Sequence, residues 1–529
     1  MALSSSNVTS GFIDLATYDE LEKYMYGGAD ATAYFVRETR KATWFTQVPV
    51  CLNKSGGDAQ FGQNWSASIS RSGDYLLNTW LQVELPFLKA AKPNQRLRWV
   101  QNFMHNLIEE CWITFNDLVA IKFDSVHLDF WSQFAYSNTQ KSVYNSMIGN
   151  ADYNNVSVNN QASSNSFPCN VAVENGQILP GGVDATGNHA DEILNLKKPL
   201  LHLPLPFFFS RDTGVALPTA ALPYNDMRIN FKFRNWNKLL LVDYHAADND
   251  APLGDVLTRH ARTDDFMVLE SSGLQVATKP ASTEPLLSNV QVWANYAIVS
   301  NDERKRMACA PRDMLIEQSQ VGSSASGYEI LSGNDISPSF NLHFSHSVKA
   351  LFFALRNVTP DVIDGVSPVD LSYYSTLHPG AMNTTEKSMP SYGVSGHSDP
   401  VLKASLVYEN TNRLFDLNSG FYSLVQPFHH ATGSDSNMPG MHMYSYSLDM
   451  LSLDPLGSTN YGKITNVSMV LHLSKLAAAA GNASATSKVD VGLGTNGELT
   501  VPQKYEFVCT AINNNIVRVS GGALGFPVL

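Results

Sequence analysis

The sequence predicts an all-β protein built from two antiparallel β-sandwiches. Many short segments alternate between apolar and polar residues, turn signals rich in Gly, Pro, Asn and Asp separate them, and few segments have a helical period. The chain has 529 residues, which is more than one hydrophobic core usually serves. Two large antiparallel sandwiches of the jelly-roll type, with long loops, are therefore expected.

The segment 204–233 shows this pattern most clearly. It opens with three consecutive phenylalanines at 207–209, which form a short apolar run. A turn signal at 212–214 and two prolines follow, and residues 226–233 then alternate between polar and apolar side chains. The segment predicts two strands that are joined by a proline-containing linker.

The order of elements in this region recurs about half a chain later. A strand at 444–448, a turn at 454–458 and an alternating strand at 467–473 repeat it, and a long strand follows each copy, at 292–299 and at 505–512. The residue identity between the copies is weak, but the repeated order indicates two domains of one kind.

This repeat sets the expected domain boundaries. Residues 1–45 precede the first clear sandwich strand, and a capping box at 17–20 predicts a helix over 18–25, so we expect an N-terminal arm there. The first domain is expected at 46–307, and the second, with the C-terminal tail, at 308–529.

Composition narrows the classes of function. Charged residues make up only 16% of the chain and the net charge is −12, so no direct contact with nucleic acid is predicted. The basic cluster at 304–306 follows two acidic residues, which is the charge pattern of a short helix. The five cysteines form no CxxC pair, which disfavours a zinc site and is typical of a reducing compartment. We expect no signal peptide and no membrane span.

Motifs for catalysis or cofactors are weak. Residues 492–497 match GxGxxG, but no helix start follows, so a hairpin turn is the better interpretation. The pairs His343 with His346 and His429 with His430 would point to opposite faces of strands, which disfavours a shared metal. We therefore predict no enzyme activity and no catalytic, cofactor-binding or metal-binding residues.

Several blocks of the sequence resemble the major capsid proteins of iridoviruses, a family of the nucleocytoplasmic large DNA viruses. The blocks are SNVTSGFIDLATYDELEKYMYGG at 6–28, RSGDYLLNTWL at 71–81, MIGN at 147–150, PLPFFFSRDTGVALPTAALPYN at 204–225, SLVYENTNRL at 405–414, GSTNYGKITN at 457–466 and GGALGFPVL at 521–529. They run from one end of the chain to the other, and the invertebrate iridoviruses are the members that the chain resembles most.

The resemblance implies a double jelly roll, that is, two tandem eight-stranded antiparallel rolls with long loops and a few short helices. It implies a structural protein of the virion capsid, assembled in the host cytoplasm, that forms a homotrimer with the pseudo-hexameric outline of a capsomer. Such capsomers would tile an icosahedral shell around an internal membrane and a double-stranded DNA genome. The implied partners are neighbouring capsomers and minor capsid proteins, with only indirect contact to the membrane side and no cofactor.

Candidate assembly contacts are assigned by their location in the arm and in the apolar run at 207–209. They are Phe12, Leu15, Tyr18, Tyr24, Tyr26, Phe207, Phe208 and Phe209.

The alternative is a two-domain β-sandwich that binds or hydrolyses carbohydrate. Exposed aromatic residues and two close carboxylates in the long loops, expected at 150–189, 243–284 and 359–399, would favour it. These loops contain Tyr373, Tyr374 and Tyr392 but no Trp, and no paired acids stand out.

Overall fold

The computed structural model divides the chain into two compact units, 1–44 and 45–529. It describes residues 8–28, 31–36, 39, 41–86, 88–90, 95–149, 172–174, 177–179, 195–196, 200–245, 256–268, 284–309, 311–322, 330–331, 337–358, 371–375, 399–433, 440–474 and 505–525. The GxGxxG match, Tyr392 and most of the three predicted long loops lie outside these residues.

The first unit contains two short helices, α1 (Val8–Ala16) and α2 (Glu20–Met25). The sequence predicts only the second, and with a capping box two residues too early. Asp19 is the N-cap of α2, because its backbone is extended and its side chain forms a reciprocal capping box with Glu22. The Thr17 hydroxyl instead donates to the Asp14 carbonyl, 2.6 Å away.

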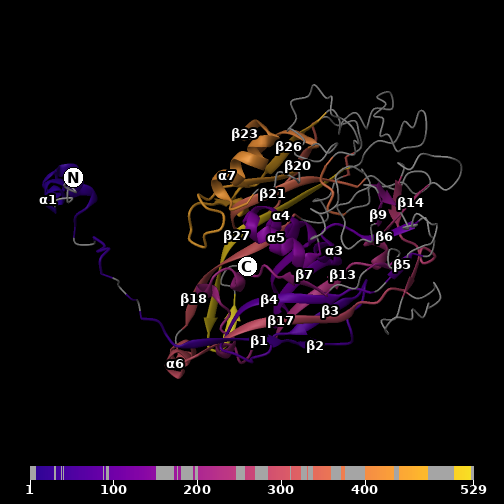
Figure 1. The fold of residues 1–529 in the computed structure, drawn as a ribbon, viewed down its shortest axis with the longest axis horizontal. Helices are drawn as coiled ribbons and strands as arrows, with labels where there is room; N and C mark the ends of the chain where they lie inside the picture. The colour runs from indigo at the N-terminus through magenta and orange to yellow at the C-terminus, as the bar shows by residue number, and fades with distance from the viewer. Residues whose placement is uncertain are drawn as a thin grey trace, which may run out of the picture. The chain divides into compact units, whose positions relative to one another are not determined.

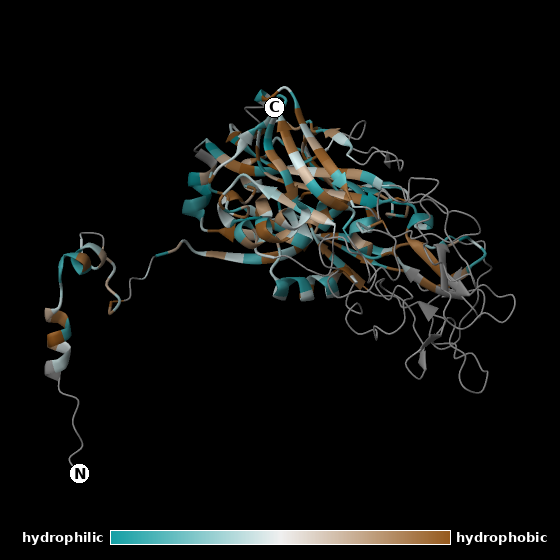
Figure 2. Ribbon diagram, turned by 90° about the horizontal axis from the view of Figure 1, so that it is seen from above, coloured by the Kyte–Doolittle hydropathy of each residue, from teal (hydrophilic) through white to brown (hydrophobic). Residues whose placement is uncertain are grey.

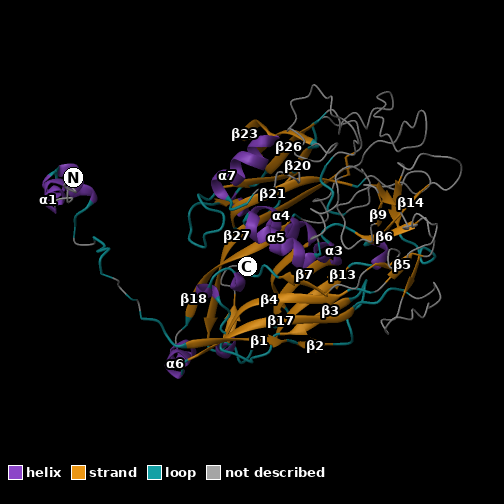
Figure 3. Ribbon diagram, in the orientation of Figure 1, coloured by secondary structure: helices purple, strands orange, loops and turns teal. Residues whose placement is uncertain are grey.

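The second unit begins with a sandwich of two antiparallel sheets, which we call the first roll (Figures 1 and 3). One sheet has the order β1-β17-β4-β12: β1 (Phe45–Cys51), β17 (Ser288–Val299), β4 (Tyr75–Glu84) and β12 (Leu200–Pro204). The facing sheet has the order β2-β3-β13-β7-β8: β2 (Asn53–Ser55), β3 (Asn64–Ser68), β13 (Met227–Phe233), β7 (Ile108–Phe115) and β8 (Leu118–Asp124).

The second roll repeats this plan. One sheet has the order β18-β27-β21-β24: β18 (Arg312–Val321), β27 (Tyr505–Ser520), β21 (Ser347–Asn357) and β24 (Met441–Ser445). The facing sheet has the order β20-β26-β22-β23: β20 (Ser339–Asn341), β26 (Val467–Leu473), β22 (Val401–Tyr408) and β23 (Thr411–Asn418).

The strand order identifies both sandwiches as jelly rolls. The eight sandwich strands of each roll, counted along the chain with β2 left aside, form one sheet in the order 1-8-3-6 and a facing sheet in the order 2-7-4-5. These two sheets of four antiparallel strands are the jelly-roll arrangement. The predicted double jelly roll is therefore confirmed. The repeat found in the sequence corresponds to strands six, seven and eight of each roll, except that the sixth strand of the first roll, β12, ends at Pro204, before the apolar run at 207–209.

The additional strands are β5 (Leu88–Ala90), β6 (Gln95–Trp99), β9 (Ala172–Glu174), β10 (Gln177–Leu179), β11 (Asn195–Leu196), β14 (Leu240–His245), β15 (Val256–His260), β16 (Phe266–Val268), β19 (Ile330–Leu331), β25 (Thr459–Asn460) and β28 (Ala523–Gly525). Of these strands, β19, β25 and β28 join the β18-β27-β21-β24 sheet, and the others form the small sheets β10-β9, β11-β5-β16 and β15-β14-β6. The helices are α3 (Phe103–Leu107), α4 (Ser125–Phe134), α5 (Asn138–Ile148), α6 (Asn301–Cys309) and α7 (Gln426–His430), together with the π-helical turn η6 (Phe421–Val425) and the 3-10 turns η2 (Phe208–Ser210), η3 (Thr213–Val215), η4 (Thr219–Ala221), η5 (Trp236–Lys238) and η7 (Tyr461–Lys463).

Alternating side chains build a core in each roll. Along β13 and β26 every second residue is buried, which is the period of a strand with one face on a core. Figure 2 shows hydrophobic and hydrophilic residues alternating along several strands of the second unit. Strand β21 is different, because eight consecutive residues from Val348 to Leu355 are buried. Both of its faces are therefore covered, and the second cover comes from the first roll.

Helix α6 connects the last strand of the first roll to the first strand of the second. Its acidic first turn and basic last turn match the predicted charge pattern. Arg304 on this helix donates two hydrogen bonds of 2.8 Å to the carboxylate of Asp74, which also accepts one from the Val299 amide. Burial alone would raise the pKa of Asp74, but these bonds outweigh it and lower the pKa below its ordinary value.

Candidate functional site: the junction between the two jelly rolls

The two rolls meet through β8 and α4 of the first roll and the outer face of the β18-β27-β21-β24 sheet. Strand β8 lies across β18, where the Gln318 side chain donates to the Ala120 carbonyl at 2.7 Å and the Ser319 hydroxyl donates to the Lys122 carbonyl at 3.0 Å. Helix α4 follows β8 directly and covers β21, β24 and β27. Figures 1 and 3 show α4 between strands of the two rolls.

The apolar part of the junction is a stack of phenylalanine rings. Val126, Phe130 and Phe134 are spaced by four residues, so they share one face of α4. The Phe352 ring lies parallel to both phenylalanines, with centroid distances of 5.8 Å to Phe130 and 5.6 Å to Phe134. The face of β21 that carries Phe352 packs against the helix. The opposite face, which carries Leu351, points into the core of the second roll.

The charged part of the junction is a carboxylate shared by two cations. Glu317 on β18 accepts from Arg211 at 3.1 Å through one oxygen and from Lys349 on β21 through the other. Lys349 also donates to the Ser452 carbonyl. The side chains of Glu317 and Lys349 are 6% and 1% exposed, so water screens this pair only weakly.

Arg211 carries this interaction across the junction. It follows the three phenylalanines in the first roll, and its guanidinium lies 4.5 Å from the centre of the Trp131 ring on α4. It donates a further hydrogen bond of 3.1 Å to the Leu451 carbonyl of the second roll. Arg211 therefore uses a stacked face and two donor edges to join helix α4, β18 and the 451–452 turn.

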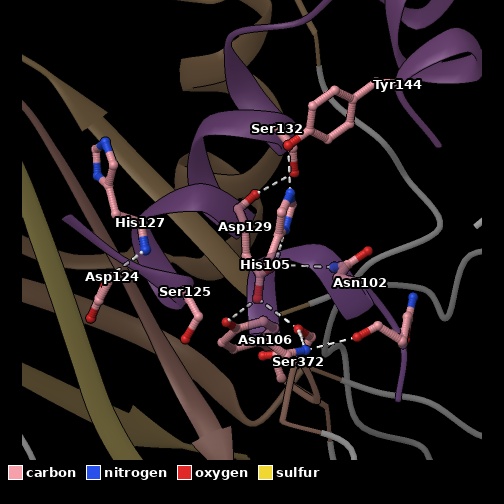
Figure 4. A network of polar contacts seen from close by, with 12 residues as sticks. Asn102, His105, Asn106, Asp124, Ser125, His127, Asp129, Ser132, Tyr144 and Ser372 are labelled. Atoms are coloured by element: carbon pink, nitrogen blue, oxygen red, sulfur yellow. Dashed lines mark hydrogen bonds and ion pairs between the residues drawn. The ribbon is translucent and has the colours of Figure 1, made fainter. Parts of the chain in front are cut away.

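A second polar network surrounds Asp129 on the other side of α4 (Figure 4). One oxygen of the carboxylate accepts from Asn102 at 3.0 Å and lies 2.6 Å from Nδ1 of His105. The other oxygen accepts from the hydroxyls of Ser372 and Tyr374, both at 2.8 Å. Because residues 371–375 follow β21, this network also ties the first roll to the second.

The network continues from His105 to Tyr144 on α5. Nε2 of His105 lies 2.5 Å from the Tyr144 hydroxyl, and the imidazole is fully buried. Burial raises the pKa of Tyr144 well above its ordinary value, so the phenol keeps its proton. Because a carboxylate oxygen only accepts, Nδ1 of His105 is the donor to Asp129. Every contact of the Asp129 carboxylate therefore has a donor, as a structural tie requires.

His127 is a buried histidine outside this network (Figure 4). Its ring lies near the rings of Phe123 and Trp131, with centroid distances of 6.3 and 6.1 Å. Its Nδ1 atom has no hydrogen-bond partner. Burial lowers the pKa of His127 to about 4, so the ring is neutral at pH 7.

Within the described ranges, no group of three or more His, Cys, Asp or Glu side chains is placed to hold a metal ion. The same ranges contain no helix with the length and apolarity of a membrane span. Tyr374, one of the aromatic residues that a carbohydrate site would need on its surface, is instead buried against Asp129.

Comparison with known proteins identifies the family. The profile of the family described as the large eukaryotic DNA virus major capsid protein matches residues 303–525, and that of the major capsid protein N-terminus matches residues 33–299. The major capsid protein of Costelytra zealandica iridescent virus is 48% identical over the whole length of both chains. This chain belongs to the family of iridovirus major capsid proteins.

Other relatives and solved structures agree with this assignment. The major capsid protein of Invertebrate iridescent virus 6 is 47% identical over the full length of both chains, and that of Rana tigrina ranavirus is 38% identical. A chain of the PBCV-1 virus capsid has a similar fold, with a TM-score of 0.60 at 18% identity, covering 94% of this chain and 100% of that chain. The Faustovirus major capsid protein gives 0.59 at 9% identity, covering 97% and 99%. The chain is thus a structural component of a virion capsid, and not an enzyme.

For a capsid protein, the surfaces that contact other copies matter most, and three predicted contacts are wrong. Phe207, Phe208 and Phe209 are at most 1% exposed and belong to the core of the first roll. They do not extend a strand, because β12 ends at Pro204 and a 3-10 turn then directs the rings inward. An apolar run that sequence alone assigned to an interface is here part of the folded subunit.

The five predicted contacts in the arm have exposed side chains. The exposed fractions are Phe12 66%, Leu15 73%, Tyr18 48%, Tyr24 88% and Tyr26 75%. Their role in assembly stays a prediction.

The junction residues were missed by sequence reasoning, although one signal was present. Lys349 stands alone in the run SVKALFFAL, and a lysine inside a strand that is buried on both faces needs a partner of opposite charge. No local pattern identifies Glu317 as that partner, because it lies 32 residues before Lys349. Arg211, which pairs with Glu317, lies a further 106 residues earlier in the chain.

Proposed function

We propose that this capsid protein forms a homotrimeric capsomer with a pseudo-hexameric outline. These capsomers tile an icosahedral shell around an internal membrane and a double-stranded DNA genome, with assembly in the host cytoplasm. Each capsomer contacts neighbouring capsomers and minor capsid proteins, and it meets the membrane side only indirectly.

The observation that carries this proposal is that one chain contains two rolls with the same strand order, fixed against each other by a buried junction. We place these rolls at 46–307 and 308–529. A ring of three identical chains closes by threefold symmetry, and it then contains six similar rolls. The internal repeat therefore gives the proposed threefold assembly a nearly sixfold outline, without any sixfold symmetry of the chain.

The arm, residues 1–45, is proposed to extend the contact between subunits. Its two helices are short, and the α2 helix has no buried residue. Helices of nine and six residues are marginal in water without a packing partner. Exposed Phe12, Leu15 and Tyr24 offer the apolar surface that a neighbouring protein surface would cover.

Contact with the genome is not part of the proposal. The net charge of −12 opposes the accumulation of phosphate groups at the surface of the shell protein.

Electron microscopy of the purified protein tests the proposal. Class averages of single particles should show a hexagonal outline whose density repeats with threefold symmetry. Single particles that contain only two rolls, or rings with another number of chains, would overturn it.

A further inference from the structure

At the junction inside the chain, a covering surface of the first roll packs on a covered surface of the second roll. Because the rolls share one topology, the second roll has its own counterpart of the covering surface, and the first roll has its own counterpart of the covered surface. The covering surface is the fifth strand of the first roll, β8, with the helix that follows it, α4. The covered surface is the outer face of the sheet that contains strands one, eight, three and six of the second roll.

The equivalent of the covering surface is β23 with η6 and α7. Strand β23 is the fifth strand of the second roll, and η6 and α7 follow it within three residues, as α4 follows β8. However, Phe415 on β23 is 67% exposed and Phe428 on α7 is 81% exposed, whereas Phe130 on α4 is fully buried. Leu448, whose carbonyl lies 3.0 Å from Nδ1 of His430 on α7, is 73% exposed. These three exposed apolar side chains lie on the elements that correspond to β8 and α4 and on the segment that contacts α7.

The equivalent of the covered surface is the outer face of the β1-β17-β4-β12 sheet. Strand β1 is exposed along nearly its whole length, whereas the matching strand β18 is covered by β8. At the centre of this face, Trp80 on β4 and Trp293 on β17 are register partners, and their rings stack at 6.3 Å. They occupy the third and eighth strands, as do the register partners Phe352 and Thr510 beneath α4.

We propose that these two open surfaces meet between copies of the chain. Strand β23 of one copy lies across β1 of the next, and Phe428 on α7 packs over the Trp80–Trp293 pair. The contact is head-to-tail, because the two surfaces differ, and a head-to-tail contact closes into a ring when its rotation is the right fraction of a turn. The inference rests on the proposed trimer and assigns its seam: the second copy forms between chains the contact that the first copy already makes within itself.

Cross-linking locates the seam. Cys51 on β1 is exposed and is the register partner of Trp293, so it lies on the outer face. A Phe415→Cys variant treated with a short bismaleimide should give covalent dimers and trimers on a denaturing gel. Phe415→Cys with Cys51→Ser should not give them. Val143→Cys, which places a thiol at a 63% exposed position on α5, is the matched control and should also show only the wild-type background.

Charge insertion tests the same seam by mass. Phe428→Asp should convert the trimer to a species near the 58.1 kDa of one chain, with an unchanged unfolding midpoint, whereas Val143→Asp should stay trimeric. A trimeric wild type whose Phe428→Asp variant is still trimeric, with no Cys51-dependent cross-link, would show that the trimer stands but its seam lies elsewhere. A monomeric wild type would instead overturn the proposed trimer, and the seam with it.

Discussion

The Glu317 carboxylate pairs with two cations at the junction, the buried Lys349 and the partly buried Arg211. Removal of one partner from a buried ion pair leaves the other charge without compensation, which costs far more than the loss of a surface pair. The exposed pair Asp313–Arg518 provides the comparison within the same chain, because about half of each side chain is accessible to solvent.

We expect Glu317→Gln to lower the free energy of unfolding by about 3–5 kcal/mol, because Lys349 then stays buried without a counter-charge. Asp313→Asn, the control, should leave the unfolding curve unchanged. Denaturant unfolding of both variants measures the difference. Equal effects of the two substitutions would mean that the buried cluster does not hold the junction.

His127 predicts a pH dependence of stability. Its pKa is about 4 in the folded chain and 6.5 in the unfolded chain, so the unfolded chain binds more protons between these values. The contribution of the neutral ring is complete above about pH 6.5, falls as the pH drops toward 4, and amounts to about 3 kcal/mol. His127→Phe should be less sensitive to acid than the wild type over this window. The same loss of stability in both proteins would place the acid-sensitive group elsewhere.

At the scale of elements, the sequence predicts strands well and their packing poorly. Alternation predicts β13 and β26, because one face of each lies on a core and the other does not. Strand β21 has no such alternation, because it is buried on both faces. Its continuous apolar run predicts that both faces are covered but does not identify the element that covers each face. The prediction of Phe207 as an assembly contact was wrong for a related reason. An apolar run shows that its side chains avoid water, but it does not show whether their own subunit or another subunit covers them.

The RSGD turn at 71–74 joins three elements. Gly73 lies so close to β17 that a Cβ atom there would be 2.5 Å from Cβ of Tyr296, which is itself fixed by a 2.6 Å hydrogen bond to the Ser70 carbonyl. The next residue, Asp74, binds Arg304 on α6. This turn therefore fixes β4, β17 and the connection to the second roll.

Gly73→Ala should lower the free energy of unfolding by about 1–3 kcal/mol, since the backbone must move to admit the methyl group. Gly57→Ala is the control, because a Cβ at Gly57 meets nothing within 4 Å. Thermal unfolding compares the two variants. The account of this turn is contradicted if Gly73→Ala is as stable as the control.

At the scale of the whole molecule, the proposed trimer takes its nearly sixfold outline from the internal repeat of the chain. The order of strands six to eight was readable in the sequence twice, and it corresponds to two rolls of one topology. The difference between the two rolls could not be predicted from the sequence, because it lies in which side chains are exposed to solvent. Phe130 and Phe428 are both phenylalanines after a fifth strand, but only the first is covered within the chain.

The solution mass of the purified protein, measured by light scattering, tests the central claim most directly. The account predicts a stable species of about 174 kDa, three times the 58.1 kDa of one chain. A protein that stays at the mass of one chain at micromolar concentration, with its fold intact, would contradict it.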